Sequence, residues 1–471
     1  SSEPVERAVE LFQKQIGQQV RPTLVTYNTL ILAFSKRGQA EDAKNILDFL
    51  LEQGGDIRPD TISFNSVLYA YAVNGDGIQA ESLLKEMMQR AANGNVHVKA
   101  DTISFNTVLH AFRNDPQRAQ DLVSHMETLY QAGNEDVEPD VYSYTSVIRA
   151  WASSKNKHAA TNAKFLLDTM EELAETQDRP LVAPNTVTYS CVIKALATSR
   201  KAGSAQDSQQ VLERMLERYE SSGNDNVKPD VVVFSNVIDA WARDSSEHSA
   251  SRALELLQQM KTSDIVEPNA RTYTSVFRAL AKRGECNAAE LLLQELRESP
   301  RLSLSTIHYN SVLDAHAKSP YWNKADRAMD FLLKMERDSN VAPDIITYNS
   351  VLSACANTYG RGKNRALSVC VNMFKRPVVL ERATPITYFL LFKALAKLLP
   401  VSDARRWNLI QQGFKLCTKS GLLSQRVLTQ VLRACTAEQF ARLVPTDGTT
   451  KRPVPYSKLP IEWTCNAQQT R

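Results

Sequence analysis

The chain has 471 residues, 43% of them hydrophobic, and its 56 Lys and Arg against 52 Asp and Glu leave a formal charge of only +4. That charge is far from those of the strongly basic tails of non-specific nucleic-acid binders, so any affinity for RNA must depend on where the charges lie. No apolar run approaches the roughly 18 residues of a membrane-spanning helix, so we expect no contact with a membrane. The seven cysteines are scattered without a Cys-x-x-Cys pair, which favours buried thiols in a reducing compartment over a metal site.

Residues 1–23 read as the end of a repeat: a second helix and then a polar closing loop. Neither an initiator Met nor an Arg-rich, acid-poor leader precedes this segment. We therefore expect a processed or truncated N-terminus and a first repeat that is only partly present.

From residue 24 to about residue 400, an aromatic residue is followed six positions later by alanine, and the pair recurs ten times. The interval between successive aromatics runs from 36 residues (Tyr273 to Tyr309) to 45 residues (Tyr144 to Tyr189). The aromatic positions are Tyr27, Phe64, Phe105, Tyr144, Tyr189, Phe234, Tyr273, Tyr309, Tyr348 and Tyr388. Leu or Val three residues past each aromatic completes one stripe of a helix. Self-similarity at about 40 residues is typical of a helical solenoid.

A second amphipathic helix follows the first in each unit. Ala43, Ile46, Leu47 and Leu50 stand at i, i+3, i+4 and i+7, and later units repeat this spacing. Most units close on a polar loop ending in Pro-Asp or Pro-Asn, where proline stops the helix and Asp or Asn can cap the next one. Neither helix buries its face alone, so neighbouring units must share a core. The prediction is an all-α protein, a right-handed α-solenoid of about ten helix-turn-helix repeats.

The repeats weaken toward the C-terminus. Residues 24–384 hold nine regular units, whereas residues 385–444 read as degenerate repeats that cap the stack. Residues 445–471 are rich in proline, and we expect an irregular tail without a helix. Leu459 and Trp463 could pack this tail against the last helices, and a loose tail is the alternative.

The repeated strings Val-Thr-Tyr-Asn, Ala-x2-Leu-Leu-x2-Met and Lys-Pro-Asp resemble the pentatricopeptide repeat family of organellar RNA-binding proteins. The resemblance runs from about residue 3 to the early 440s, most of the chain. The units are longer than the family's usual ones, and the extra residues fall in polar loops and turns, where insertions are tolerated. The resemblance implies binding of single-stranded RNA in a mitochondrion or a plastid.

The residue after each aromatic is polar in all nine regular repeats: Asn28, Asn65, Asn106, Thr145, Ser190, Ser235, Thr274, Asn310 and Asn349. In the family this residue and the last residue of the unit jointly select one base. The last residues are Asp60, Asp101, Asp140, Asn185, Asp230, Asn269, Ser305, Asp344 and Thr384. For the nine pairs in order, the resemblance implies 5′-UUUAGA-purine-U-pyrimidine-3′. The alternative interpretation is local capping or a solvated helix face.

Two further columns fit the same interpretation. In the family, an aliphatic residue two before the aromatic sandwiches the base, and here it would be Val25, Ile62, Ile103, Val187, Val232, Ile307 and Ile346. Tyr142 and Arg271 depart from this pattern, although their flat side chains can also stack on bases. Nine residues past the aromatic, where the family places Lys near phosphates, stand Lys36, Arg243, Lys282, Lys318 and Lys397. The alternative for these cations is a solvated helix end that favours positive charge.

The sequence predicts no enzyme, no cofactor and no metal. The family's deaminase signature of His-x-Glu with Cys-x-x-Cys is missing, and no phosphate-binding glycine loop occurs. We expect sequence-specific RNA binding that supports transcript processing, stability or translation, with ribosomes or RNA-processing proteins as further partners. A second hypothesis is an architectural subunit of an organellar ribosome. A third, a tetratricopeptide-like adapter, is disfavoured because the Trp-x2-Leu-Gly-x2-Tyr pattern is missing.

Overall fold

The computed structural model describes residues 21–52, 57–177, 179–199, 201–263, 265–299, 302–337, 341–444 and 455–467. The second helix expected within residues 1–23 falls almost entirely outside these ranges. In the described part the chain is helical, without a β-strand. It divides into two compact units, Ser1–Ala240 and Trp241–Arg471, whose boundary lies inside α12.

Each repeat contains a first helix and a second helix joined by a short turn. The first helices are α2 (Leu24–Lys36), α4 (Thr61–Asn74), α6 (Thr102–Ala111), α8 (Val141–Ser153), α10 (Thr186–Thr198), α12 (Val231–Arg243), α14 (Ala270–Arg283), α16 (Thr306–Lys318), α18 (Ile345–Asn357), α21 (Pro385–Leu398) and α23 (Gln425–Ala434). The second helices are α3 (Ala40–Glu52), α5 (Gly77–Ala92), α7 (Pro116–Gln131), α9 (Ala159–Thr176), α11 (Ser204–Ser222), α13 (Ser249–Thr262), α15 (Cys286–Glu298), α17 (Lys324–Arg337), α19 (Lys363–Phe374), α22 (Ala404–Lys419) and α24 (Ala437–Leu443).

Shorter helices lie in the connections. Five of them are single 3-10 turns, of which four lie before or between the main helices and one lies in the C-terminal segment. They are η1 (Glu135–Val137), η2 (Pro180–Val182), η3 (Asp225–Val227), η4 (Gly360–Gly362) and η5 (Tyr456–Lys458). Two short α-helices, α20 (Pro377–Glu381) and α25 (Ile461–Thr464), complete the described elements.

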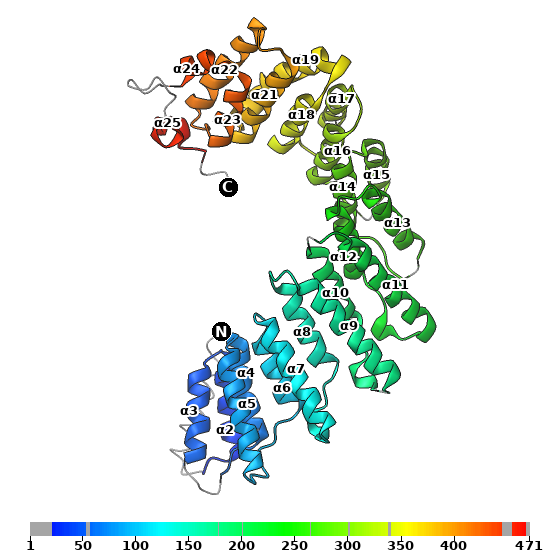
Figure 1. The fold of residues 1–471 in the computed structure, drawn as a ribbon, viewed down its shortest axis with the longest axis vertical. Helices are drawn as coiled ribbons and strands as arrows, with labels where there is room; N and C mark the ends of the chain where they lie inside the picture. Colours follow the sequence, from blue (N-terminus) through cyan, green and yellow to red (C-terminus); the bar gives the residue numbers. More distant parts are fainter. Residues whose placement is uncertain are drawn as a thin grey trace. The chain divides into compact units, whose positions relative to one another are not determined.

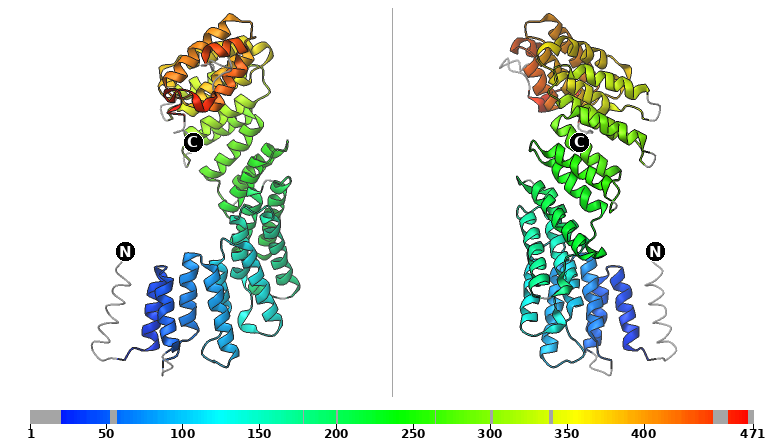
Figure 2. Two further views of the ribbon diagram at one scale, coloured as in Figure 1. Left: turned by 60° about the vertical axis from the view of Figure 1, so that its left-hand side comes forward. Right: turned by 90° about the vertical axis from the view of Figure 1, so that its right-hand side faces the viewer.

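Within each unit, every first helix packs beside the first helices of the neighbouring repeats. In the N-terminal unit α2, α4, α6, α8 and α10 pack in this order, and in the C-terminal unit α14, α16, α18, α21 and α23 do the same (Figure 1). The second helices pack against the first helices on one side, so each unit is a two-layer stack (Figure 2). The predicted all-α solenoid of stacked helix pairs is confirmed.

The repeated apolar residues form the shared core. Phe64, Phe105 and Tyr189 are completely buried, as are the aliphatic residues three positions after them. The alanine six positions after the aromatic is buried in nine of the ten copies, and only Ala33 is half-buried. Alanine keeps the neighbouring helix close, because a larger side chain at this contact would overpack the core.

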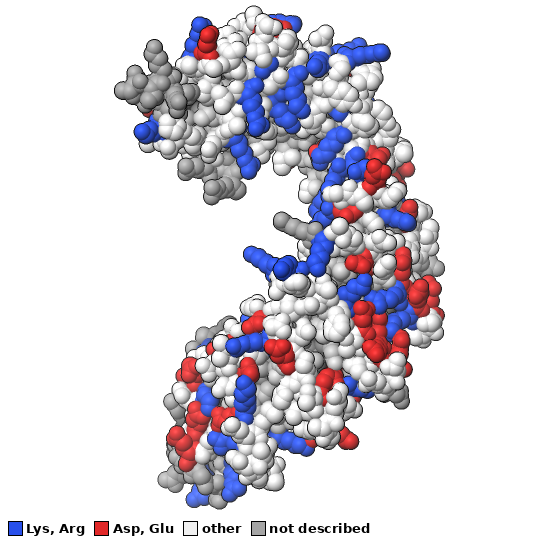
Figure 3. Space-filling model, viewed as in Figure 1, with Lys and Arg blue, Asp and Glu red and all other residues white. Residues whose placement is uncertain are grey.

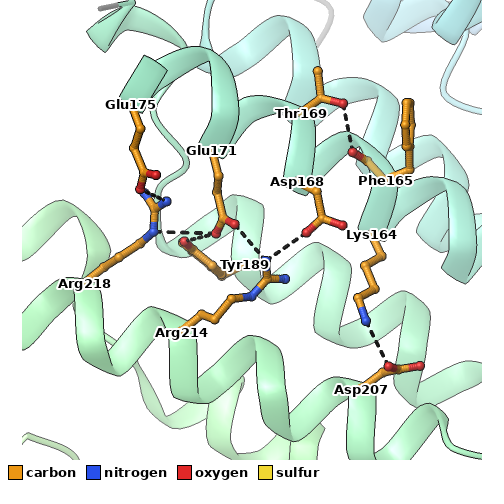
Figure 4. A network of polar contacts seen from close by, with 10 residues as sticks. All are labelled: Lys164, Phe165, Asp168, Thr169, Glu171, Glu175, Tyr189, Asp207, Arg214 and Arg218. Atoms are coloured by element: carbon orange, nitrogen blue, oxygen red, sulfur yellow. Dashed lines mark hydrogen bonds and ion pairs between the residues drawn. The ribbon is translucent and has the colours of Figure 1, made fainter. Parts of the chain in front are cut away.

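Charged side chains connect successive second helices in the N-terminal unit. Arg214 of α11 donates to both Asp168 and Glu171 of α9, each at 2.8 Å (Figure 4). The hydroxyl of Tyr189 donates to Glu171 over 2.6 Å, and burial together with this carboxylate raises the pKa of the tyrosine. Such a partly buried network fixes the register between repeats, since Glu171 has three partners, Tyr189, Arg214 and Arg218.

The C-terminal segment differs from the expectation. Residues 461–464 form a helical turn, α25, where we predicted no helix. Trp463 packs edge-on against Phe414 with ring centres 5.7 Å apart, and its carbonyl accepts the backbone N–H of Leu423. Leu459 is buried. The described part of the tail is therefore packed against the last helices, because these apolar side chains find a surface that sequence periodicity does not reveal.

The described residues contain neither a membrane-spanning helix nor a cluster of metal ligands. Among the described residues, no helix is both long and apolar enough to cross a bilayer. No set of three or more His, Cys, Asp or Glu side chains in the same ranges is arranged to hold a metal ion.

Candidate functional site

The nine polar residues after the aromatics lie at the start of the second turn of the first helices. Because the aromatic is buried, the next residue is turned by about 100° toward the neighbouring first helix. Thr145, Ser235 and Asn349 are buried, and the other six are half-buried. None of the nine is exposed, which argues against the alternative of a solvated helix face.

The last residue of most units caps the next first helix, as predicted. Six of these side chains accept the backbone N–H of the third helical residue: Asp60, Asp101, Asp140, Asn185, Asn269 and Asp344. Asp230 accepts the backbone N–H groups of Val232 and Val233. Ser305 and Thr384 also occupy N-cap positions. Each cap satisfies an amide that the helix leaves without a partner.

In four repeats the two predicted readers are in direct contact. The Asn amide nitrogen donates to Oδ1 of the Asp that caps the next first helix: Asn28 to Asp60 (3.2 Å), Asn65 to Asp101 (3.4 Å), Asn106 to Asp140 (3.1 Å) and Asn310 to Asp344 (3.2 Å). More than 30 residues separate the members of each pair, and the packing of adjacent first helices brings them together. Every Asn–Asp pair is thus one composite polar group built from two repeats.

In three of the four pairs a buried hydroxyl, not predicted from the sequence, sets the orientation of the Asn amide; in the fourth, the amide oxygen of Asn310 is buried without a hydrogen-bond partner among the described residues. Ser63 accepts the backbone N–H of Asp60 and donates to Oδ1 of Asn28 over 2.6 Å. Ser104 and Ser143 make the same contact to Asn65 and Asn106, each at 2.7 Å. Because the amide oxygen faces the hydroxyl, the amide nitrogen faces the Asp. The signal was present in the sequence as Ser or Thr directly before most aromatics.

Two repeats replace the Asn–Asp contact by a relay through this third residue. The hydroxyls of Thr145 and Thr188 lie 2.7 Å apart, and Thr188 donates to Oδ1 of Asn185 over 3.1 Å. In the C-terminal unit, His308 stands between Thr274 (3.4 Å from Nε2) and Ser305 (3.1 Å from Nδ1). Burial lowers the pKa of His308, which favours the neutral ring.

The remaining pairs are not joined in this way. Val233 takes the place of the hydroxyl residue beside Ser190 and Asp230, and no hydrogen bond links these two within the described residues. The amide oxygen of Asn349 is buried without a hydrogen-bond partner in the described part of the chain. Ser235 belongs to the N-terminal unit and Asn269 to the C-terminal unit. Only part of the predicted reader column therefore forms the direct contact.

The aliphatic residues two before each aromatic are exposed without exception, although they are large and apolar. Their exposed fractions are 73% for Val25, 63% for Ile62, 64% for Ile103, 47% for Val187, 42% for Val232, 60% for Ile307 and 59% for Ile346. Single exposed aliphatic residues are ordinary, but a column at one position of seven of the nine regular repeats is not. These side chains stand one turn before the polar readers and present apolar surface beside them.

The five cations nine residues past the aromatics are all exposed. Lys282 and Lys318 have partners within the chain. Lys282 donates to the carbonyl oxygens of Arg243 and Asp244 at the end of α12, and Lys318 pairs with Asp314 at 2.6 Å. Lys282 thus caps the end of the preceding first helix, in agreement with the alternative stated for this column.

Comparison with known proteins identifies the repeats. The family model of the pentatricopeptide repeat domain matches residues 127–199 and 291–358, and that of the PPR repeat matches residues 25–55, 62–90 and 271–300. Two relatives in Arabidopsis thaliana are pentatricopeptide repeat-containing proteins. The one named as mitochondrial is 33% identical over 96 residues, which are 20% of this chain and 22% of that protein. The one named as chloroplastic is 31% identical over 88 residues, which are 19% and 11% of the two chains.

A solved structure, the pentatricopeptide repeat protein PPR10 in complex with an 18-nt psaJ RNA element, is 20% identical with a TM-score of 0.41. The match covers 90% of this chain and 62% of the PPR10 chain. Both similarity values are low, and they support no statement about the ligand of this chain. The matches of the family models, the relatives and the repeated helix pairs agree: the chain belongs to the pentatricopeptide repeat family.

Proposed function

We propose that this protein binds single-stranded RNA sequence-specifically, one base per repeat, and that it does so in an organelle. The observation that carries the proposal is the row of Asn–Asp contacts between consecutive first helices. Repeat proteins that read RNA use two or three side chains per base, and the Asn, Asp and Ser of each composite group supply that number.

The composite group has the chemistry to select a pyrimidine edge. In the pair of Asn28 and Asp60, Oδ1 of Asp60 accepts the bonds described above, and Oδ2 takes part in none of them. One N–H of the Asn28 amide is left as well, because an amide nitrogen carries two. A donor beside an acceptor matches uracil, whose N3–H lies next to a carbonyl oxygen. Asn–Asp pairs would therefore select U.

The exposed aliphatic column would hold the base in place. Val25 and Ile62 lie on consecutive first helices, α2 and α4, on either side of the reader Asn28 in chain order. Flat apolar faces on both sides of a base remove it from water and leave only its edge for hydrogen bonding. This arrangement separates affinity, supplied by the aliphatic residues, from selectivity, supplied by the polar pairs.

The preferred RNA would then follow the order of the pairs, 5′-UUUAGA-purine-U-pyrimidine-3′. Occupying such a segment would shield a transcript from nucleases or remodel it for processing or translation. Because the matched segments span no more than 22% of the two relatives, the activity and partners of the whole protein are part of this proposal.

The test is a binding titration by fluorescence anisotropy with the predicted nine-nucleotide RNA. Controls are an RNA of the same composition in scrambled order, the same sequence as DNA, and its RNA duplex. We expect at least about tenfold tighter binding of the predicted RNA than of the scrambled one, a difference of about 1.4 kcal/mol. Equal affinity for both RNAs would show that the column does not read bases.

A further inference from the structure

Charge is distributed very unevenly along the chain. Residues 1–340 contain 37 Lys and Arg against 46 Asp and Glu, whereas residues 341–444 contain 15 against only four. The overall charge of +4 therefore conceals an acidic stretch of −9 and a basic stretch of +11. Figure 3 shows Lys and Arg side chains gathered over α18 to α22 with few acidic side chains among them. We call residues 341–444 the basic segment.

Most cations of the basic segment have no acidic partner. Arg365, Arg376 and Arg405 lie near Asp326, Glu336 and Asp403, and Arg406 is buried against backbone carbonyl oxygens. The other eleven make no ion pair within the described residues: Arg361, Lys363, Lys375, Arg382, Lys393, Lys397, Lys415, Lys419, Arg426, Arg433 and Arg442. In the N-terminal unit, by contrast, Lys44, Lys164, Arg179, Arg214 and Arg218 all have carboxylate partners.

Lys397 of the basic segment lies close enough to two other lysines, Lys324 just before the segment and Lys393 within it, for their charges to repel. Lys324, at the start of α17, is buried and lies over the ring of Tyr359 at 5.1 Å. Lys393 of α21 donates to Oδ1 of Asn357 over 3.3 Å. Burial, and after it the charge of Lys397, lowers the pKa of both Lys324 and Lys393. Like charges at such proximity cost free energy in the free protein, and a bound anion would remove that cost.

From α21 onward, the basic segment also loses the means to select bases. Tyr388 is followed by Phe389, which has no group to hydrogen-bond a base edge. In α23, Arg426 is the second residue of the helix, the place that exposed Ile386 occupies in α21. Arg433 of α23 and Lys393 of α21 are each the ninth residue of neighbouring first helices. Phe389 thus replaces a reader in α21 and Arg426 replaces a stacker in α23, while Lys393 and Arg433 add positive charge to the same two helices.

We infer that the basic segment binds the phosphate backbone of RNA that flanks the base-read stretch, without regard to its sequence. The inference rests on the proposed function for the identity of the nucleic acid. With the polarity that the family resemblance implies, the flank is the 3′ side, because the basic segment follows the readers in the chain. Most of the readers lie in the acidic stretch, and the basic segment, which holds only the last of them, supplies the electrostatic attraction that the others lack.

The test compares four RNAs on the full chain: the predicted nine-nucleotide core, the core with ten unrelated nucleotides added at the 3′ end, the core with the same ten at the 5′ end, and a scrambled core with the 3′ extension. A triple variant, Lys393→Gln, Arg426→Gln and Arg433→Gln, removes three cations of the basic segment that have no acidic partner among the described residues. A matched control, Lys155→Gln, Lys157→Gln and Lys201→Gln, removes three exposed cations from inter-helix turns of the N-terminal unit.

We expect the 3′ extension to tighten binding whatever its sequence, and the triple variant to abolish this gain while its affinity for the core is unchanged. Each phosphate contact on a single strand adds about 0.7 to the steepness with which log K falls against log[salt], so three contacts add about two. The gain in affinity should therefore shrink roughly 16-fold between 50 and 200 mM salt. The control variant should keep the gain. An equal gain from the 5′ extension, or a gain that the triple variant retains, overturns the inference.

Failure of the proposed function is recognised separately. If base reading is absent, the core and its scrambled version bind equally, yet the effect of the 3′ extension and of the triple variant is still measured on both. Circular dichroism of the triple variant checks the fold. If its helicity is lost, the single variant Arg426→Gln, which changes one exposed side chain on α23, is tested in its place. If that folded variant keeps the full gain and salt slope, the inference is overturned.

Discussion

The amide nitrogen of Asn28 lies 3.2 Å from Oδ1 of Asp60, although 32 residues separate them in the sequence. Asp60 is at the same time the N-cap of α4, so one carboxylate both caps the start of a helix and contacts the reader of the preceding repeat. The sequence already allowed the last residue of a unit to combine capping with base reading. In the structure one oxygen makes the cap, and the group can serve both roles.

The first prediction concerns the identity of the base at the second regular repeat. Replacing Asn65 by Thr, with Asp101 unchanged, should turn a preference for U into one for G, because the carboxamide is lost and a hydroxyl leaves room for a purine. Affinity for the UUUAGA-type RNA should fall by roughly 1–3 kcal/mol. An RNA with G at the second position should recover most of this loss in anisotropy titrations. Asn74→Thr, at the other end of α4, is the control and should leave the preference for U intact.

The second prediction concerns the orienting hydroxyl. Ser63→Ala removes the group that faces the amide oxygen of Asn28, so the amide is free to turn. Discrimination of U from C at the first position should fall roughly tenfold, the lower end of what a bidentate base contact contributes. Stability should decrease by about 1–3 kcal/mol, because two hydrogen bonds of the Ser63 hydroxyl, to Asn28 and from the backbone of Asp60, are lost. Ser66→Ala removes a hydroxyl that bonds only the carbonyl of Ile62, and unchanged discrimination is expected there.

The third prediction separates stacking from stability. Ile62 and Ile78 are both 63% exposed, the first beside the readers and the second on α5. Changing either to Ser should alter the free energy of unfolding by no more than about 0.5 kcal/mol, since neither is buried. Only Ile62→Ser should weaken RNA binding, by about 1 kcal/mol. Equal affinities of the two variants would contradict a role of the exposed column in RNA binding.

The fourth prediction is a pH dependence at His308. Burial lowers its pKa below the ordinary 6.5, and Nδ1 accepts the backbone N–H of Ser305, so a proton there would break a helix cap. Because the unfolded chain takes up the proton more readily, α16 should lose stability as the pH falls below about 6.5. His308→Thr should show a smaller loss between pH 7.5 and pH 5.5.

Hydrogen exchange of the α16 amides measures this difference locally. Comparison of the two proteins cancels the contribution of His316, which lies in the same helix and whose pKa is shifted upward despite its burial, by Cys286 and Glu290. An identical pH dependence in wild type and His308→Thr would refute the assignment to His308.

The helices and caps could be predicted from the sequence because they depend on neighbours along the chain. The aromatic-to-alanine spacing gives the buried stripe, and Pro-Asp at the unit ends gives the N-caps that Asp60 and Asp101 form. The contact of Asn28 with Asp60 depends on how closely two helices approach, which no local pattern contains. The hydroxyl of Ser63 was overlooked for the same reason, since its partner is in the preceding repeat.

The same limit explains the errors at the C-terminus and among the cations. The helical turn at Ile461–Thr464 is stabilised by contacts with Phe414 and Leu423, far away in the sequence. Lys282 was assigned to phosphate by its position, but its ammonium group reaches carbonyl oxygens at the end of α12. The aliphatic residues two before the aromatics, to which the family resemblance gives a role in stacking, are exposed, and their contact with a base stays a prediction.

Because each composite group is built from two repeats, the unit of recognition is offset from the unit of folding. A segment exchanged between proteins from Thr61 to Asp101 would carry Asn65 and its carboxylate but would leave the orienting Ser104 to the recipient. A segment from Phe64 to Ser104 carries all three side chains of one reader. Duplication or grafting of repeats should therefore preserve specificity only when the junction falls inside the first turn of a first helix, so that inheritance of the code depends on where the gene is cut.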